Sequence, residues 1–173
     1  MRVLLIALTL AAVLGCTGSK GDTSQDAASV TSDSTMFADG YTVLQLFKTR
    51  TGHITVTMDV NGKPCVFLVD TGGGATLIDK AKRHHYGLEA SKTGDYAAGI
   101  GSVSSLVKTE ATFHINGQDI IEKDIYLMDI TYINAEFKKN RARQVDGVLG
   151  TDFLDRYGAV IDYAQRKMYL RIR

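Results

Sequence analysis

The sequence predicts an all-β domain, a small barrel or folded sheet with one or two short helices. Residues 54–60 alternate between apolar and polar side chains, which is the period of a half-buried strand. Two Asn-Gly dipeptides, Asn61-Gly62 and Asn116-Gly117, follow apolar runs and accept the positive φ angles of tight hairpins. Many short strands separated by close-set turns are typical of this class.

The first hairpin leads into the centre of the predicted sheet. Its return strand, residues 65–69, is apolar throughout, so we expect it to be buried on both faces. Residues 78–86 are expected to form a short helix or a loop, and residues 96–106 a Gly/Ser-rich hairpin. A second hairpin at Asn116-Gly117 is expected to continue in strand to residue 130.

The last third of the chain combines a basic segment with a helix and two strands. Residues 138–143 (KKNRAR) are predicted as a solvated loop, or alternatively as a basic patch that faces a substrate near the functional site. An apolar turn, Val148-Leu149-Gly150, precedes a predicted helix over residues 151–157. Strands over residues 159–163 and 168–172 complete the domain.

Composition limits the function classes. The 173 residues, 45% of them hydrophobic, fit one globular domain, and the net charge of +1 argues against nucleic acid as the main partner. The four histidines and two cysteines show no metal-ligand spacing, so we expect no metal and no other cofactor. Cys65 lies inside an apolar run, where a free cysteine behaves as a small core hydrophobe.

The amino terminus predicts the compartment. Residues 3–14 form an apolar run that is too short to span a bilayer and has the shape of a secretory signal sequence. The run ends in Val13-Leu14-Gly15-Cys16, which resembles the bacterial lipobox, so Cys16 is the expected lipidation site. An ordinary signal peptide with an incidental cysteine, or a short buried helix, is the alternative.

This interpretation divides the chain into three parts. Residues 1–16 are the expected signal peptide, residues 17–40 a flexible tether rich in small polar side chains, and residues 41–173 the folded domain. We expect a bacterial cell-envelope protein that is anchored to the membrane through its lipid. Thr17, where an aspartate would signal inner-membrane retention, favours the outer membrane, with the domain facing the periplasm.

The residues that point to chemistry are Asp70-Thr71-Gly72, at the end of the predicted central strand. A carboxylate at this place is held on rigid backbone next to a turn, which suits a side chain that must be aimed. A turn without chemistry is the alternative, since Asp and Gly both favour turns. The chain contains no second Asp-Thr-Gly.

Several segments together resemble one known family. Residues 67–78 (FLVDTGGGATLI) resemble the catalytic loop of retropepsin-like aspartic peptidases, and residues 146–154 (DGVLGTDFL) are similar to that family's second signature. Residues 158–163 are similar to the end of its bacterial single-lobe members. The resemblance covers residues 41–173, with every motif in the expected order.

The resemblance implies a single-lobe retropepsin-like barrel with the activity of an aspartic-type endopeptidase on peptides or proteins. Asp70 would be catalytic, with Thr71 and Gly72 completing its loop. Two facing aspartates share one proton, so one acts as general base on a water while the other acts as acid. Because this chain supplies one Asp-Thr-Gly, a complete site needs Asp70 from two chains, most simply in a homodimer.

The same resemblance assigns two supporting groups. Gly99, Ile100 and Gly101 would form the flap, the hairpin that covers bound substrate in this family. Val148, Leu149 and Gly150 would support the catalytic loop from beside it.

The sequence departs from the family pattern after Asp-Thr-Gly. Gly73 stands where the family usually carries alanine or serine, so no hydroxyl donates to the outer carboxylate oxygen. We therefore expect activity nearer to neutral pH than in relatives with serine. The alternative function is a non-catalytic envelope lipoprotein that uses the same fold for peptide binding or complex assembly.

Overall fold

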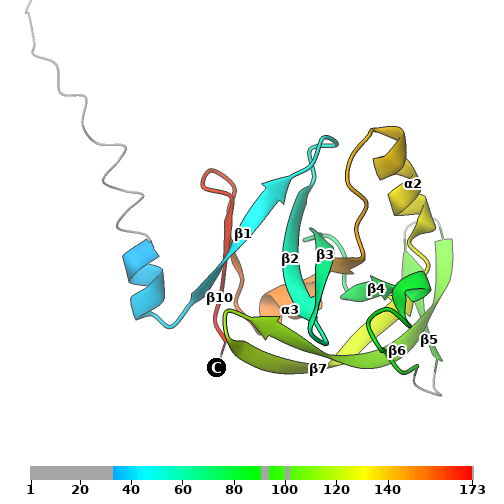
Figure 1. Ribbon diagram of the computed structural model, residues 1–173, viewed down its shortest axis with the longest axis horizontal. Helices are drawn as coiled ribbons and strands as arrows, with labels where there is room; N and C mark the ends of the chain where they lie inside the picture. Colours follow the sequence, from blue (N-terminus) through cyan, green and yellow to red (C-terminus); the bar gives the residue numbers. More distant parts are fainter. Residues whose placement is uncertain (1–32, 91–93, 100–101, 173) are drawn as a thin grey trace, which may run out of the picture.

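The computed structural model describes residues 33–90, 94–99 and 102–172, and strands dominate this part of the chain (Figure 1). The strands are β1 (Thr42–Lys48), β2 (Ile54–Val60), β3 (Lys63–Val69), β4 (Leu77–Asp79), β5 (Gly94–Gly99), β6 (Ser102–Ile115), β7 (Gln118–Met128), β8 (Gly147–Leu149), β9 (Val160–Asp162) and β10 (Lys167–Leu170). The helices are a segment over residues 33–38, a 3₁₀ turn (Lys80–Lys82), α2 (Thr131–Lys139) and α3 (Thr151–Arg156).

The strands form one sheet that closes on itself. Their order is β5-β6-β7-β4-β8-β3-β2-β1-β10-β9, and β6 also pairs with β2. That second pairing makes β2, β3, β8, β4, β7 and β6 a six-stranded barrel, while β1, β10 and β9 extend it on one side (Figure 1). The predicted all-β barrel with few short helices is confirmed.

The barrel interior holds the main core. Phe67 on β3 lies 5.7 Å from Phe113 on β6, and Phe113 lies 5.5 Å from Phe153 on α3, measured between ring centroids. All three rings are buried, so α3 is fixed to the barrel by its apolar face. Cys65 is also fully buried, and burial raises the pKa of its thiol, as expected of a core residue.

Both predicted Asn-Gly hairpins are confirmed. Asn61 and Gly62 have φ angles of 49° and 75°, and Asn116 and Gly117 have 47° and 86°, which are the left-handed values of a two-residue hairpin turn. The Asn61 side chain also accepts a hydrogen bond from the Thr112 amide at 2.8 Å. The first hairpin is thereby tied to β6 on the neighbouring edge of the barrel.

The structure corrects two sequence predictions. Residues 78–86 contain a short strand, β4, followed by a 3₁₀ turn rather than one helix or a plain loop. Residues 138–143 were expected to be a loop throughout, yet Lys138 and Lys139 are the last residues of α2, which the sequence did not predict. Asn134 and Phe137 are buried on this helix, so tertiary packing outweighs its weak helical propensity.

Residues 33–38, within the expected tether, are helical and contact the sheet. The Asp33 carboxylate accepts hydrogen bonds from Lys167 and Tyr169 on β10. These partners lower the pKa of Asp33, and the hydrogen bond from Lys167 has the largest effect. In the described ranges no helix has the length and hydrophobicity needed to cross a membrane.

Candidate active site

Asp70 follows the last residue of β3, and backbone groups fix it on two sides. Its N–H donates to the Leu149 carbonyl at 3.0 Å, which continues the pairing of β3 with β8. The Gly72 N–H donates to Asp70 Oδ1 at 2.9 Å. Within the described residues Oδ2 accepts no hydrogen bond, so one carboxylate oxygen is held while the other is left for a water, a proton or a second carboxylate.

β8 lies between the strands on either side of the Asp70 loop. It pairs in parallel with β3 and antiparallel with β4, so residues 70–76 cross over its end. A Cβ on Gly147 would lie 2.4 Å from the Leu77 carbonyl oxygen, and one on Gly150 would lie 2.5 Å from the same atom of Ala75. Both positions require glycine, because the two backbones pass too closely for any side chain.

Gly150 and the next residue, Thr151, also form hydrogen bonds to the Asp70 loop. The Gly150 N–H donates to Thr76 Oγ1 at 3.1 Å, and the Thr151 N–H donates to the Gly73 carbonyl at 2.7 Å. The structure therefore brings Val148, Leu149 and Gly150 alongside the Asp70 loop.

A carboxylate that sequence analysis did not single out locks this loop to α3. Asp152 accepts from the Thr76 amide at 3.0 Å and from the Thr76 hydroxyl at 2.7 Å. Thr76 is buried, so its hydroxyl spans from Asp152 to the Gly150 amide without contact with water. The two partners are 76 positions apart in the sequence, so no local pattern reveals the pair, although both lie inside the quoted motifs.

A second carboxylate, Asp146, fastens the other end of β8. Its Oδ2 accepts from the Val66 amide at 3.0 Å, and its main-chain carbonyl accepts from the Asp79 amide at 2.8 Å. Lys82 lies 3.5 Å from Oδ1 and partly balances the charge. Together with the Thr76–Asp152 pair, this contact fixes both ends of β8 beneath Asp70.

Thr71 faces away from these contacts. Its side chain is exposed and forms no hydrogen bond within the described part of the chain. It borders a cavity of about 380 Å³ that reaches the edge strand β9 through Ile161. The remaining lining residues come from α3 and the turn after it: Thr151, Leu154, Asp155, Gly158 and Ala159.

The predicted flap is a hairpin whose tip lies partly outside the described residues. Gly99 is the last residue of β5 and pairs with Ser102 on β6, whereas Ile100 and Gly101 are not among the described residues. Further along β6, Leu106 lines a cavity of about 460 Å³ together with Gly74 and Ala75. The base of the hairpin therefore borders the Asp70 loop.

Two further expectations concern lipid and metal. Cys16, the expected lipidation site, lies outside the described residues. Across residues 33–90, 94–99 and 102–172, His, Cys, Asp and Glu form no group of three or more that is able to share a metal ion.

Comparison with known proteins shows which family model matches the region around Asp70. A family model described as aspartyl protease matches residues 56–153, which include the Asp70 loop, the β5–β6 hairpin and β8. No curated protein matches the chain in sequence.

Solved structures of three proteases or protease-like domains are similar to this chain. The EIAV protease complexed with the inhibitor HBY-793 shares 22% identity over 62% of this chain and 90% of its own, with a TM-score of 0.48. A retropepsin-like aspartic protease from Rickettsia conorii shares 20% identity over 76% and 89%, with a TM-score of 0.47. The retroviral protease-like domain of Ddi1 from Leishmania major shares 17% identity over 67% and 86%, with a TM-score of 0.49.

Proposed function

This chain belongs to the aspartyl protease family, and on that premise we propose that it is an aspartic endopeptidase whose site is completed by Asp70 of a second copy. The proposal rests on the hydrogen bonds that fix Asp70 and its loop. One carboxylate oxygen is held by the Gly72 amide, and the loop behind it is fixed to β8 and α3. Such a carboxylate is preorganised for proton transfer.

The reaction needs one ionised and one protonated carboxylate. The ionised Asp70 takes a proton from a water whose oxygen attacks the peptide carbonyl, while the protonated Asp70 of the other copy donates to the carbonyl oxygen. The first carboxylate then returns its proton to the leaving amine as the C–N bond breaks, and the second recovers its own from the intermediate. Two like charges at close range favour the shared-proton state from which this begins.

The side of the molecule next to Asp70 supports pairing with a second copy. β9 ends the sheet, so its outer edge is unpaired among the described residues. Val160 and Tyr163 are 44% and 65% exposed there, and the cavity beside Thr71 opens between this edge and the catalytic loop. An exposed edge with apolar side chains is a template for strand pairing between chains.

The test compares the wild type with Asp70→Asn on a diverse peptide pool, from acidic to neutral pH, with cleavage read by mass spectrometry. Asparagine keeps an oxygen for the Gly72 amide, so the loop is preserved while the ionisable group is lost. We expect cuts by the wild type alone. If both proteins leave the pool intact at concentrations where sedimentation shows a dimer, the chain is a peptide-binding module instead.

We also propose that Cys16 carries the lipid that anchors the domain in the bacterial envelope, most simply at the outer membrane. The support is the apolar run over residues 3–14 and the lipobox-like ending. Metabolic labelling with a radioactive fatty acid is expected to mark the wild type and not Cys16→Ser. Equal labelling of both proteins would contradict the assignment.

A further inference from the structure

A basic groove of about 400 Å³, separate from the catalytic loop, lies between the β1–β2 hairpin and the segment that follows α2. Val66 and Thr55 are buried at its floor. Its rim carries four cations, Lys48, Arg50, Arg141 and Arg143, and no acidic residue lines it.

The four cations lack carboxylate partners. All are exposed, and none of them forms an ion pair within the described residues, although nine such contacts occur elsewhere there. Phe47, which is 56% exposed, stands beside them. The groove therefore combines unbalanced positive charge with an exposed aromatic ring, a surface that complements an anionic ligand with apolar parts.

The strand register places this groove at the catalytic end of the sheet. Thr55 on β2 pairs with Leu68 on β3, two residues before Asp70, and Phe47 pairs with Thr55. The β1–β2 turn thus projects at the end of the barrel where β3 delivers Asp70. His53 of this turn packs on Phe137 of α2 at 5.5 Å, which joins the two sides of the groove.

One of the arginines occupies a backbone conformation that favours glycine. Arg141 has a φ of 54°, and the α2 terminus closes through Ala142 N–H to the Phe137 carbonyl at 2.8 Å and Arg141 N–H to the Lys138 carbonyl at 3.0 Å. Glycine is the usual residue at this left-handed position. A long cationic side chain therefore stands here against the local backbone preference, as it does at Arg166, and at Arg141 that side chain lines the groove.

We propose that this groove is a substrate exosite, which binds an acidic segment of the polypeptide that is cleaved at Asp70. Glutamate or aspartate side chains of the substrate pair with the rim cations, and apolar side chains of the same segment contact Phe47 and the floor. The inference rests on the proposed function, and it names the substrate class: polypeptides with an acidic stretch away from the scissile bond.

The test measures binding separately from cleavage. The full chain carrying Asp70→Asn is titrated against a dye-labelled peptide of alternating Glu and Leu, and against its Gln-Leu counterpart, by fluorescence anisotropy. We expect the Glu peptide to bind more tightly, with an affinity that falls as salt rises. Arg141→Gln with Arg143→Gln is expected to weaken this binding by roughly tenfold, the effect of losing two partly exposed ion pairs.

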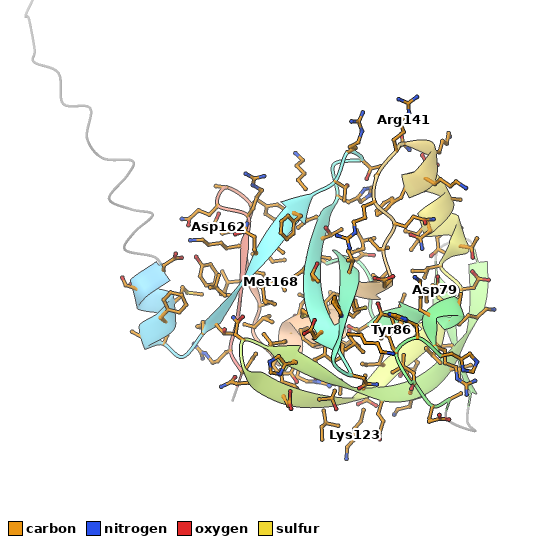
Figure 2. All side chains as sticks on the ribbon, in the orientation of Figure 1. Asp79, Tyr86, Lys123, Arg141, Asp162 and Met168 are labelled. Atoms are coloured by element: carbon orange, nitrogen blue, oxygen red, sulfur yellow. The ribbon has the colours of Figure 1, made fainter. Side chains whose placement is uncertain are left out.

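The matched control is Lys123→Gln. Lys123 is an exposed cation on the opposite side of the molecule from Arg141 (Figure 2), so the same kind of charge loss there is expected to leave peptide affinity unchanged. Equal affinity for the two peptides, or equal losses in the arginine and lysine variants, would overturn the proposal. Arginine-dependent binding to phosphatidylglycerol vesicles, without binding to the Glu peptide, would show that the groove binds lipid headgroups. That result would also overturn the proposal.

A second variant separates function from folding. Arg141→Gly relieves the left-handed strain, so it is expected to raise the melting temperature of the domain. The same change is expected to lower the affinity for the Glu peptide. With active enzyme, this variant is expected to raise KM for an acid-flanked substrate and to leave kcat unchanged. Failure of the proposed function appears as no cleavage by the wild type; failure of the exosite appears as cleavage with no acidic preference.

Discussion

Replacing Thr76 by valine tests whether the buried hydroxyl holds the Asp70 loop. Valine has the shape of threonine, so no cavity is created. The change removes a hydrogen bond to the Asp152 carboxylate (2.7 Å) and leaves the Gly150 amide without its acceptor (3.1 Å). A lost bond to a charged group and an unsatisfied buried amide together cost about 3 kcal/mol. For a domain of this size, the melting temperature should fall by about 10 °C.

The assay is urea unfolding followed by circular dichroism, with Thr55→Val as the matched control. Thr55 is also buried, but its hydroxyl makes one long hydrogen bond, 3.3 Å to the Phe47 carbonyl, so its loss should cost less than about 1 kcal/mol. A double-mutant cycle of Thr76→Val with Asp152→Ala should show a coupling above about 0.5 kcal/mol. Equal losses of unfolding free energy for the two threonine variants, or additivity in the cycle, would refute the claim that the Thr76 hydroxyl holds the Asp70 loop to α3.

Three further changes probe the site and its surroundings. Gly150→Ala places a Cβ 2.5 Å from backbone atoms of Ala75 and should destabilise the domain by about 3 kcal/mol or prevent folding, as measured by urea unfolding. Gly73→Ser sets a hydroxyl beside Asp70 Oδ2, 3.1 Å from the new Cβ, and should move the acid limb of the pH–activity profile to lower pH, whereas Gly73→Ala should not. The pKa of Asp33 is lowered by its β10 partners, so its stabilising contact is present above the ordinary carboxyl pKa and is lost as the pH falls through the lowered pKa. The hydrogen-exchange protection of residues 33–38, corrected for the intrinsic rate, should therefore fall in acid and stay constant around neutral pH.

The sequence was sufficient to predict the parts of the fold that rest on local rules. Asn-Gly at 61–62 and 116–117 specified both hairpins, and the apolar run ending at Val69 specified a buried strand beside β8. The helix after Gly150 was also predicted, since a glycine turn and an acidic first turn precede its apolar residues.

The missed elements depend on contacts that no local pattern encodes. α2 begins after Ile130, whose apolar side chain cannot cap it, and the Thr131 amide donates instead to Asp129 Oδ1 at 2.9 Å. The helix is rich in weak helix formers, so burial of Phe137 contributes strongly to its stability. β1 pairs with β10 through residues 42–45 and with β2 through residues 46–48, a change of partner that the local sequence does not show.

The candidate site likewise has parts that the sequence reveals and parts that only the fold reveals. Its short motif, Asp70-Thr71-Gly72, was visible as a sequence, and so were the three residues beside it, residues 148–150. The Thr76–Asp152 and Val66–Asp146 contacts join residues 76 and 80 positions apart, and their partners are ordinary polar or apolar residues in isolation. Such pairs become recognisable only when the strands are placed side by side.

The most direct test of the central claim, that one active site uses Asp70 from two copies, is a mixing experiment. A fixed amount of wild type is equilibrated with an equal amount of Asp70→Asn, at a concentration where both are dimeric, and peptide cleavage is measured. Random exchange places about half of the wild-type chains in mixed dimers, so activity should fall to about half. Undiminished activity after demonstrated subunit exchange would mean that one Asp70 suffices, and would contradict the shared site.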